Sequence, residues 1–427
     1  MSQEMLDRLR RLGLTKGARN LKPAPKPASS AGVGRGKGHG VSRNTSLERL
    51  FPGGRVEESD FGACFIVDNV YPLSYLHGHT RLSALLDQDP STVAIYSHEE
   101  RLSGLDFRDF VFLDTETTGL YGAGTVAFMV GIAIFDRGYQ GDLLVVRQFF
   151  LRDKDDVIEM LQILSDFTAE RSGLITFNGH SFDLSILENR FLMNRLPGDL
   201  RRLPHIDLLP LARRLWRTRI GSVALNNLEK ELLAVQRSED DVPGWLIPAI
   251  YNDYLRSQDA RELVRVFYHN EIDMLSMVTL ADFMLRLIAD SSDDAHPIDL
   301  YSLAKWQADI GLAVEAEKSL KEAVQSDLPL PIFHKALARL ALLLKRQKRN
   351  REALPLWQQW AATSFDEVDA HVELAKFYEW HEKDIKTAER WTLDALLLVD
   401  SWSTSRAELM RPELNHRLAR LQRKRSA

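Results

Sequence analysis

The sequence has few of the features that are typical of secreted proteins or of membrane proteins. It contains one cysteine among 427 residues, Cys64, so no disulfide can form within the chain and a reducing compartment is expected. Residues 1–19 lack the continuous apolar stretch of a secretory signal. The longest apolar run, residues 125–135, contains Gly131 and falls short of the roughly 20 residues that span a bilayer. We therefore expect a cytoplasmic protein that does not enter a membrane.

The charge of the chain is distributed unevenly. The net charge is −5, but residues 1–50 hold 11 Lys and Arg against three Asp and Glu, which gives +8 there and −13 in the rest. Residues 15–44 are mainly Gly, Pro, Ala, Ser, Lys and Arg, a composition that predicts disorder. We interpret residues 1–45 as a basic arm that either follows nucleic-acid phosphates or only keeps the chain in solution. The leucines before residue 15 form either one amphipathic helix or a frayed terminus.

The length predicts more than one domain, because a single hydrophobic core rarely exceeds about 250–300 residues. Residues 46–106 contain short apolar runs, such as Phe61 to Val70 and Val93 to Tyr96, broken by Gly and Pro. These runs predict short strands in a β-rich segment ahead of the main domain.

Residues 107–290 have the pattern of an α/β domain. Apolar, β-branched and aromatic runs alternate with turn residues and with helical periodicity. The pattern predicts three successive antiparallel strands, then a helix, a buried strand and two further helices, over residues 110–113, 126–135, 143–151, 155–170, 174–177, 181–194 and 261–288.

Residues 299–427 show only helical patterns, and these patterns repeat. A small residue recurs at Ala316, Ala353 and Ala388, in steps of 37 and then 35 residues, close to the ~34-residue tetratricopeptide period. Such repeats stack into a solenoid with a concave binding face, for which we expect a protein partner. The alternative is a plain helical bundle.

An apolar strand delivers two acids, Asp114 and Glu116, within Phe112-Leu113-Asp114-Thr115-Glu116-Thr117. Alternate strand residues point to the same face, so both carboxylates project together. Two neighbouring negative charges are costly unless a cation neutralises them. Most isolated Asp-x-Glu pairs are merely solvated, but this pair ends a strand that should be buried.

Two further segments carry acids. Asp183 follows a buried strand, and Ser181 before it is a plausible N-cap, which predicts Asp183 in the first turn of a helix. There it either joins a site or only complements the helix dipole. In the long helix His269 and Asp273 stand four residues apart and should share a face.

Taken together these segments resemble one known pattern, that of the DEDD superfamily of 3′–5′ exonucleases, which have a ribonuclease H-like fold. The sequence is most similar to the bacterial branch of predicted exonucleases called YprB-like, which also carries C-terminal tetratricopeptide repeats. The resemblance covers about residues 46–290 and extends to Asn178-Gly179-x-x-Phe182-Asp183, His205-Ile206-Asp207-Leu208-Leu209, Asp241-Val242-Pro243-Gly244, Ile247-Pro248 and His269-Asn270.

The resemblance implies that Asp114, Glu116, Asp183 and Asp273 hold two divalent metal ions, Mg²⁺ or Mn²⁺. Carboxylate oxygens suit these hard cations. It also implies phosphodiester hydrolysis of single-stranded nucleic acid by a two-metal-ion mechanism in which Glu116 takes part. Thr117 and Asn178 would contact the terminal nucleotide or its phosphate, or else serve only in turn hydrogen bonds and capping.

One feature departs from the family pattern. The two well-known subclasses place Tyr four residues, or His five residues, before the last Asp, whereas this chain has His269 at four and Tyr268 at five. His269 shares the face of Asp273, and an imidazole accepts a proton near neutral pH, so we interpret His269 as the general base or water-orienting group. Tyr268, about 100° away around the helix, is expected in the core.

Three functions remain open at this point. The first is a metal-dependent 3′–5′ exonuclease. The second is a catalytically weak adaptor that binds nucleic acid and recruits partner proteins through its helical repeats. The third is an endonuclease or RNA-processing enzyme. The sequence does not choose between DNA and RNA, because that choice depends on contacts to the 2′-hydroxyl.

Overall fold

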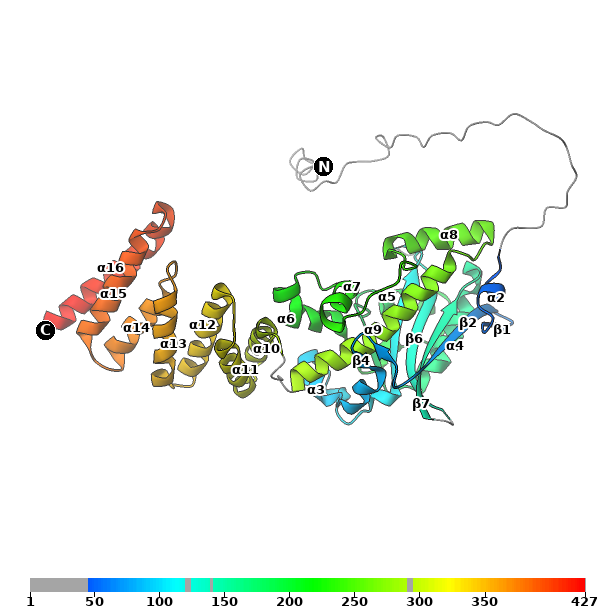
Figure 1. Ribbon diagram of the computed structural model, residues 1–427, viewed down its shortest axis with the longest axis horizontal. Coiled ribbons are helices and arrows are strands. Elements are labelled where there is room, and N and C mark those ends of the chain that lie inside the picture. Colours follow the sequence, from blue (N-terminus) through cyan, green and yellow to red (C-terminus); the bar gives the residue numbers. More distant parts are fainter. Residues whose placement is uncertain (1–44, 120–123, 139–140, 290–294, 427) are drawn as a thin grey trace, which may run out of the picture. The chain divides into compact units, whose positions relative to one another are not determined.

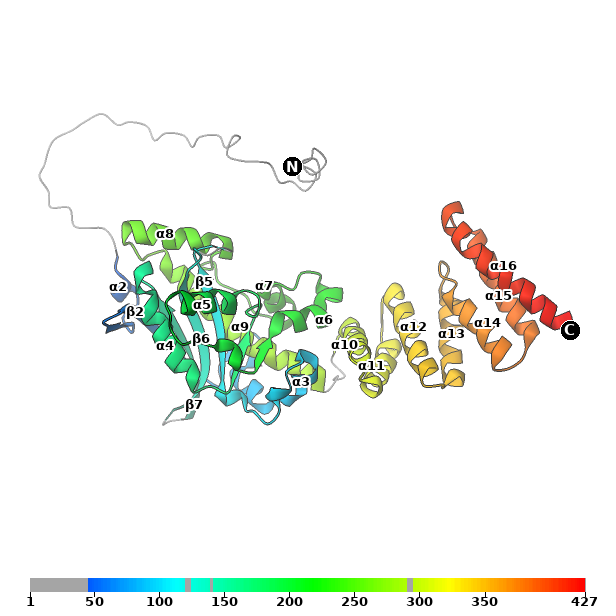
Figure 2. The same cartoon turned by 180° about the vertical axis from the view of Figure 1, so that it is seen from behind.

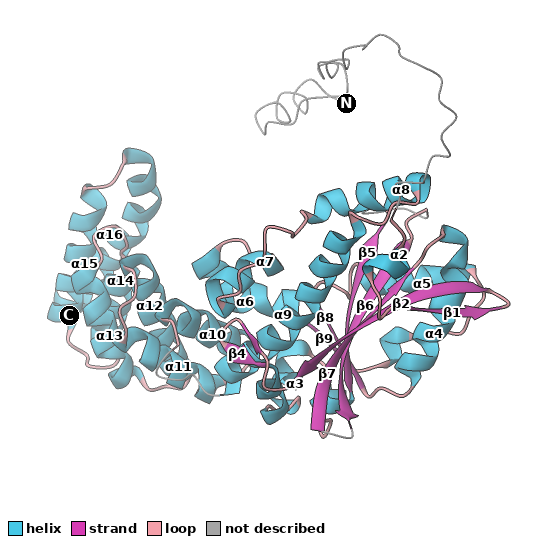
Figure 3. Cartoon of the chain, turned by 45° about the vertical axis from the view of Figure 1, so that its right-hand side comes forward, coloured by secondary structure: helices cyan, strands magenta, loops and turns pink. Residues whose placement is uncertain are grey.

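The computed structural model describes residues 45–119, 124–138, 141–289 and 295–426. The expected basic arm, residues 1–45, lies outside these ranges except for Thr45. Within these ranges the strands all precede residue 208, and every element from residue 297 onward is a helix (Figure 3). No helix of the described residues combines the length and apolar character needed to cross a membrane.

A mixed seven-stranded sheet lies at the centre of the first part, in the order β1-β2-β7-β6-β5-β8-β9. The strands are β1 (Arg55–Ser59), β2 (Gly62–Pro72), β5 (Phe110–Thr117), β6 (Ala127–Gly138), β7 (Gly141–Phe150), β8 (Gly173–Thr176) and β9 (His205–Asp207), with a separate ribbon of β3 (Leu76–His77) and β4 (Thr80–Arg81). The helices there are α2 (Leu47–Leu50), α3 (Ser91–Ser97), α4 (Val157–Ala169), α5 (Asp183–Met193), α6 (Leu208–Ile220), α7 (Leu225–Leu228), α8 (Ile247–Ser257) and α9 (Leu263–Ala289).

The predicted core of the α/β domain is confirmed. Strands β5, β6 and β7 are successive and antiparallel, whereas β8 and β9 are added to β5 in parallel. Helices α4, α5 and α9 occupy the ranges that the apolar periodicity indicated. The expected α/β fold with a mixed sheet and flanking helices is therefore correct.

The segment before β5 differs from the prediction in two ways. Strands β1 and β2 belong to the main sheet, because β2 pairs with β7 in a register that sets Val67 opposite Gln148. The strand predicted at Val93 to Tyr96 is wrong, since these residues lie in helix α3. A short apolar run suits either element, and here Val93, Ala94 and Tyr96 are buried on one side of a helix.

The sheet separates two hydrophobic cores. Phe110 and Phe112 of β5 face a core built with the second half of α9 and with α6. Val111 and Leu113 face the opposite core, which includes residues of α4 and α5. Figure 1 shows α9 in front of the sheet, and the view from behind in Figure 2 shows α4 and α5 over the other face. The alternation along β5 therefore decides which side each later residue of the strand faces.

The remaining helices form packed pairs, as expected of an all-helical second part. They are α10 (Pro297–Asp309) with α11 (Ala313–Gln325), α12 (Leu330–Arg346) with α13 (Asn350–Thr363), α14 (Asp369–Trp380) with α15 (Ile385–Asp400), and finally α16 (Thr404–Ser426). The recurring Ala316, Ala353 and Ala388 all lie in the second helix of a pair and are fully buried. The sequence repeat thus marks the points where small side chains allow the helices of a pair to approach closely.

Candidate active site

The end of strand β5 directs two acids toward helix α9. Asp114 and Glu116 continue the alternation of Phe110 and Phe112, so they point to the face that α9 covers. Asn270 of α9 confirms this geometry, because its Nδ2 donates a hydrogen bond to Asp114 Oδ2 at 3.2 Å. The shared direction of the two carboxylates, predicted from the sequence, is therefore correct.

Helix α9 reaches the acids because a glycine leaves room for it. Gly131 of β6 lies opposite Asp114 in the sheet, and a Cβ at this position would collide with the side chain of Asn270. The same Asn270 Oδ1 accepts a hydrogen bond from Gln148 Nε2 at 3.1 Å, and Gln148 also donates to the carbonyl of Phe267 at 2.8 Å. Buried hydrogen bonds of this kind fix the position of α9 against the sheet.

Asp183 joins the site from the opposite side of the strand. It is the first residue of α5, as expected, and is only 2 % exposed. Thr115 points away from Asp114 and donates its hydroxyl hydrogen to Asp183 Oδ1. Strand β5 thus carries two acids on one face and holds the third acid from its other face.

The predicted N-cap of α5 is wrong. The capping position is Phe182 rather than Ser181, and no side chain caps the helix there. The turn is instead closed by the backbone, since the amides of Phe182 and Leu184 donate to the carbonyls of Asn178 and Gly179 at 3.1 and 2.9 Å. The helix therefore begins one residue later than an N-cap at Ser181 would require.

Asp207, which the sequence analysis noted only within a motif, organises this turn. Its carboxylate accepts hydrogen bonds from the amides of Asn178 at 2.7 Å and His180 at 3.1 Å, and from Leu209 at 3.1 Å. These bonds hold Asn178 in the left-handed region at φ 71°. Asn178 lines an adjoining cavity, whereas the Thr117 hydroxyl donates to the carbonyl of Gly119 at 2.8 Å.

Helix α9 supplies the remaining predicted residues. His269 Nε2 lies 3.6 Å from Asp273 Oδ2, so the two side chains share a face as expected. Glu116, His269 and Asp273 each offer one atom that could bind a metal ion, and these three atoms lie within 4.8 Å of one another. Asp114 and Asp183 are outside this group of three, but the charge of Asp183 raises the pKa of Glu116, and the charges of Asp273 and Glu116 raise the pKa of Asp114.

The pKa values of the four acids reflect their burial and the negative charges of the acids around them. Burial raises the pKa of Asp114 well above its usual range, and the charges of Asp183, Asp273 and Glu116 raise it further. Burial, followed by the charges of Asp273 and Asp183, raises the pKa of Glu116 in the same way. Burial also raises the pKa of Asp183, to about 7, and that of Asp273. Four acids near one another, one fully and three partly buried, fit a divalent cation, because its charge would remove the cost of ionising them together.

Two residues that the sequence analysis gave no role complete the site. Arg237 binds Glu229 through two nitrogens, at 2.6 and 2.7 Å, and its Nη2 also donates to Asp273 Oδ1. Asp241 Oδ1 lies 2.8 Å from His269 Nδ1. Only Asp241 stood in a recognisable motif. The role of Arg237 depends on the fold of the loop after α7, for which the sequence has no local signal.

Tyr268 differs from the prediction that it belongs to the core. It is half-buried, and its hydroxyl oxygen accepts a hydrogen bond from the amide of Ser238 at 2.9 Å. The phenol therefore supports the loop that carries Arg237 and Asp241. The loop passes back over α9 and meets Tyr268 there, a contact that the periodicity of the helix does not predict.

Comparison with known proteins places this geometry in a family. The sequence model of the ribonuclease H superfamily matches residues 111–285, a range that contains all four acids and His269. The chain is also 32 % identical over 380 residues to the uncharacterized protein YprB of Bacillus subtilis, an alignment that covers 85 % of this chain and 87 % of YprB. The chain belongs to the YprB family. Its central domain is ribonuclease H-like, a fold consistent with a nuclease that hydrolyses phosphodiester bonds and typically uses divalent metal ions.

Proposed function

We propose that this member of the YprB family is a DEDD-type 3′–5′ exonuclease that acts on single-stranded DNA or RNA. The observation that carries the proposal is the convergence of Asp114, Glu116, Asp183 and Asp273, in which the charges of Asp183 and Asp273 raise the pKa values of both Asp114 and Glu116. Structural proteins rarely collect buried acids without compensation, because the cost of desolvation is high. The 3′ polarity follows the resemblance to the DEDD superfamily.

The four acids would hold two Mg²⁺ or Mn²⁺ ions. When bound, such a pair of ions supplies an activated water and stabilises the leaving oxygen of the phosphodiester. The chain contributes the positions of the carboxylates. Thr115 holds Asp183 and Asn270 holds Asp114, so neither acid is free to turn away from the site.

His269 would accept the proton of the attacking water at Nε2. With its proton on Nδ1, the ring donates to Asp241 Oδ1, and the Nε2 lone pair then faces the acids beside Asp273. This arrangement, in which a carboxylate fixes the tautomer of a histidine, is common to many hydrolytic sites. Asp241 is thus a positioning residue.

The substrate end would lie against the two predicted contact residues. Asn178 stands at the turn before Asp183 and lines an open cavity, so its amide is placed to meet a terminal nucleotide. Thr117, next to Glu116, would turn its hydroxyl from Gly119 to a phosphate oxygen.

The helical pairs from α10 onward would form a tetratricopeptide-like domain within residues 299–427. The single cysteine of the chain suits a cytoplasmic location.

A digestion panel tests the proposal. Single-stranded DNA, duplex DNA and RNA, each labelled at either end, are incubated with the full chain in Mn²⁺ or in EDTA. We expect stepwise shortening from the 3′ end in Mn²⁺ only, and none with Asp183→Ala. Internal fragments would indicate an endonuclease instead. Binding without shortening, in every metal, would support the adaptor that recruits partner proteins.

A further inference from the structure

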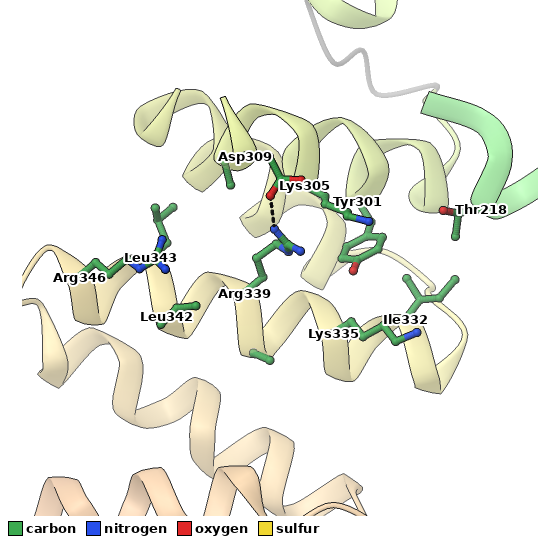
Figure 4. Close-up of a pocket in the computed structure, with 12 residues that line it drawn as sticks. Thr218, Tyr301, Lys305, Asp309, Ile332, Lys335, Arg339, Leu342, Leu343 and Arg346 are labelled. Carbon is green, nitrogen blue, oxygen red and sulfur yellow. Dashed lines mark hydrogen bonds and ion pairs between the residues drawn. The ribbon is translucent and has the colours of Figure 1, made fainter. Parts of the chain in front are cut away.

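A hollow in the helical part of the chain is rich in cations. It lies between α10 and α12, with a volume of about 630 Å³, and Thr218 of α6 reaches its rim (Figure 4). Lys305 comes from α10, and Lys335, Arg339 and Arg346 come from α12, where they are spaced by four and then seven residues. All four belong to the face that the two helices share.

The positive charge of this hollow is largely uncompensated. Its one acid, Asp309, already pairs with Arg339 at 2.9 Å. Lys305, Lys335 and Arg346 are exposed, and none of the three has an ion-pair partner among the described residues. A concave surface with three free cations, in a chain whose net charge is −5, is expected to attract a polyanion.

The hollow also offers apolar surface beside the cations. Leu342 lies between Arg339 and Arg346 on α12 and is 46 % exposed. Ile332 and Leu343 line the same space, which Tyr301 closes from α10. Apolar side chains between cations suit a single strand, whose bases contact apolar groups while its phosphates meet Lys and Arg.

A second hollow lies near the first and reaches the turn before Asp183. Asp309 lies 4.0 Å from Arg214 of α6, and Arg214 lines a cavity of about 550 Å³. This second cavity is also lined by Arg213 and by Asn178 and Ser181, which lie in the turn before Asp183. Arg213 and Arg214 of α6 therefore lie between the turn that precedes Asp183 and the hollow between α10 and α12.

We propose that the hollow between α10 and α12 binds the phosphate backbone of the nucleic-acid strand whose end lies at the acids. The inference rests on the proposed nuclease function for the direction of the strand, but not for the binding itself. Contacts to phosphates carry no sequence information, so the hollow increases affinity for long strands without selecting their sequence. The first two helical pairs thus contribute to binding of the substrate.

Binding in EDTA tests this inference apart from cleavage. The full chain is titrated with labelled oligothymidylates of about 4 to 20 nucleotides, a range that brackets known single-strand site sizes. The variant Lys305→Ala/Lys335→Ala/Arg346→Ala should bind the 20-mer at least tenfold more weakly and bind the 4-mer unchanged. Its salt dependence should lose about two units of slope, because each phosphate contact on a single strand contributes about 0.7.

The control removes equal charge elsewhere. Lys386, Arg390 and Arg423 are exposed on α15 and α16 and line neither hollow, so their replacement by alanine should change little. Equal loss in both triple variants, or none in either, would overturn the inference. The inference would also be overturned if an acidic peptide, such as oligoglutamate, bound to the hollow while the affinity for the 20-mer was the same in the variants as in the parent chain. If no substrate is cleaved but the 20-mer still depends on the hollow, only the proposed enzymatic function fails.

Discussion

His269 and Asp241 face each other across the loop that follows α7, with Nδ1 and Oδ1 2.8 Å apart. The contact fixes one nitrogen of the ring and leaves the other beside Asp273. It also explains how the exchanged order of Tyr and His before Asp273 is accommodated, because the tyrosine supports the loop while the histidine faces the acids.

The roles of these residues are testable by turnover. His269→Ala should lower kcat by roughly 10²–10⁴-fold, the usual range for a lost general acid or base, while Mn²⁺ binding by calorimetry survives. Tyr268→Phe removes only a hydroxyl and should stay within a few-fold of the parent chain. The reverse pattern, with an inactive phenylalanine variant and an active alanine variant, would make Tyr268 the catalytic group.

Asp241 should affect the rate through His269. Asp241→Ala frees the ring and should lower kcat with little change in KM, whereas Asp241→Asn keeps an oxygen that accepts from Nδ1 and should recover part of the loss. Equal losses in the two variants would show that the charge of Asp241, rather than its hydrogen bond, matters. Rates measured in the His269→Ala background should not fall further.

The four acids predict opposite changes in activity and stability. Asp114→Ala and Asp183→Ala should each abolish metal-dependent cleavage with the fold intact. Without metal, Asp114→Asn should also raise the melting temperature of the ribonuclease H-like domain by about 2–4 °C, because it removes the cost of a buried carboxylate and its repulsion by the other acids, together worth about 1 kcal/mol. Calorimetry in EDTA and in Mn²⁺ separates the two effects. A variant that cleaves normally contradicts the assignment of that acid.

The basic arm should act on binding alone. Deletion of residues 1–44 removes a net charge of +8 and should weaken nucleic-acid binding and flatten its salt dependence, with kcat at saturating substrate nearly unchanged. The measurement is a salt titration of affinity for both chains. Identical slopes would make the arm a solubility tail.

His77 predicts how stability depends on pH. Burial lowers the pKa of His77 to about 4, and its Nε2 lies 2.8 Å from the hydroxyl of Ser276. The unfolded chain therefore takes up this proton near pH 6.5 and the folded chain only near pH 4. Stability is fully present above pH 6.5 and falls by about 1.4 kcal/mol per pH unit between these values, up to about 3 kcal/mol. Urea titrations should show a flatter profile for His77→Gln.

Gly131 should be intolerant of any side chain. Gly131→Ala places a methyl group against Asn270, which displaces α9 or the hydrogen bond to Asp114. We expect a stability loss of about 1–3 kcal/mol, the usual cost of overpacking, together with a larger loss of activity. Unfolding curves and rates for this variant, compared with Gly124→Ala, where a Cβ meets nothing within 4 Å, measure both.

The sequence predicted best where local periodicity and burial agree. The central strands, α9 and the shared faces of Asp114 with Glu116 and His269 with Asp273 follow from repeats of two and four residues. The prediction failed at Val93 to Tyr96, where a short apolar run suits either element, and at Ser181, where backbone bonds replaced the cap. Arg237 and the pairing of β2 with β7 depend on contacts between distant segments, which no local pattern encodes.

The separation of the acids along the chain has a consequence for synthesis. Asp114 and Asp273 are 159 residues apart, and Asn270, which holds Asp114, emerges only with α9. At ribosomal rates of about 5–20 residues per second, β5 is made roughly 8–30 s before its partner helix. During that interval the nascent chain holds two of the acids and then, once residue 183 is made, three of them, but not Asp273. The nuclease that we propose would therefore lack its complete set of acids until α9 has left the ribosome.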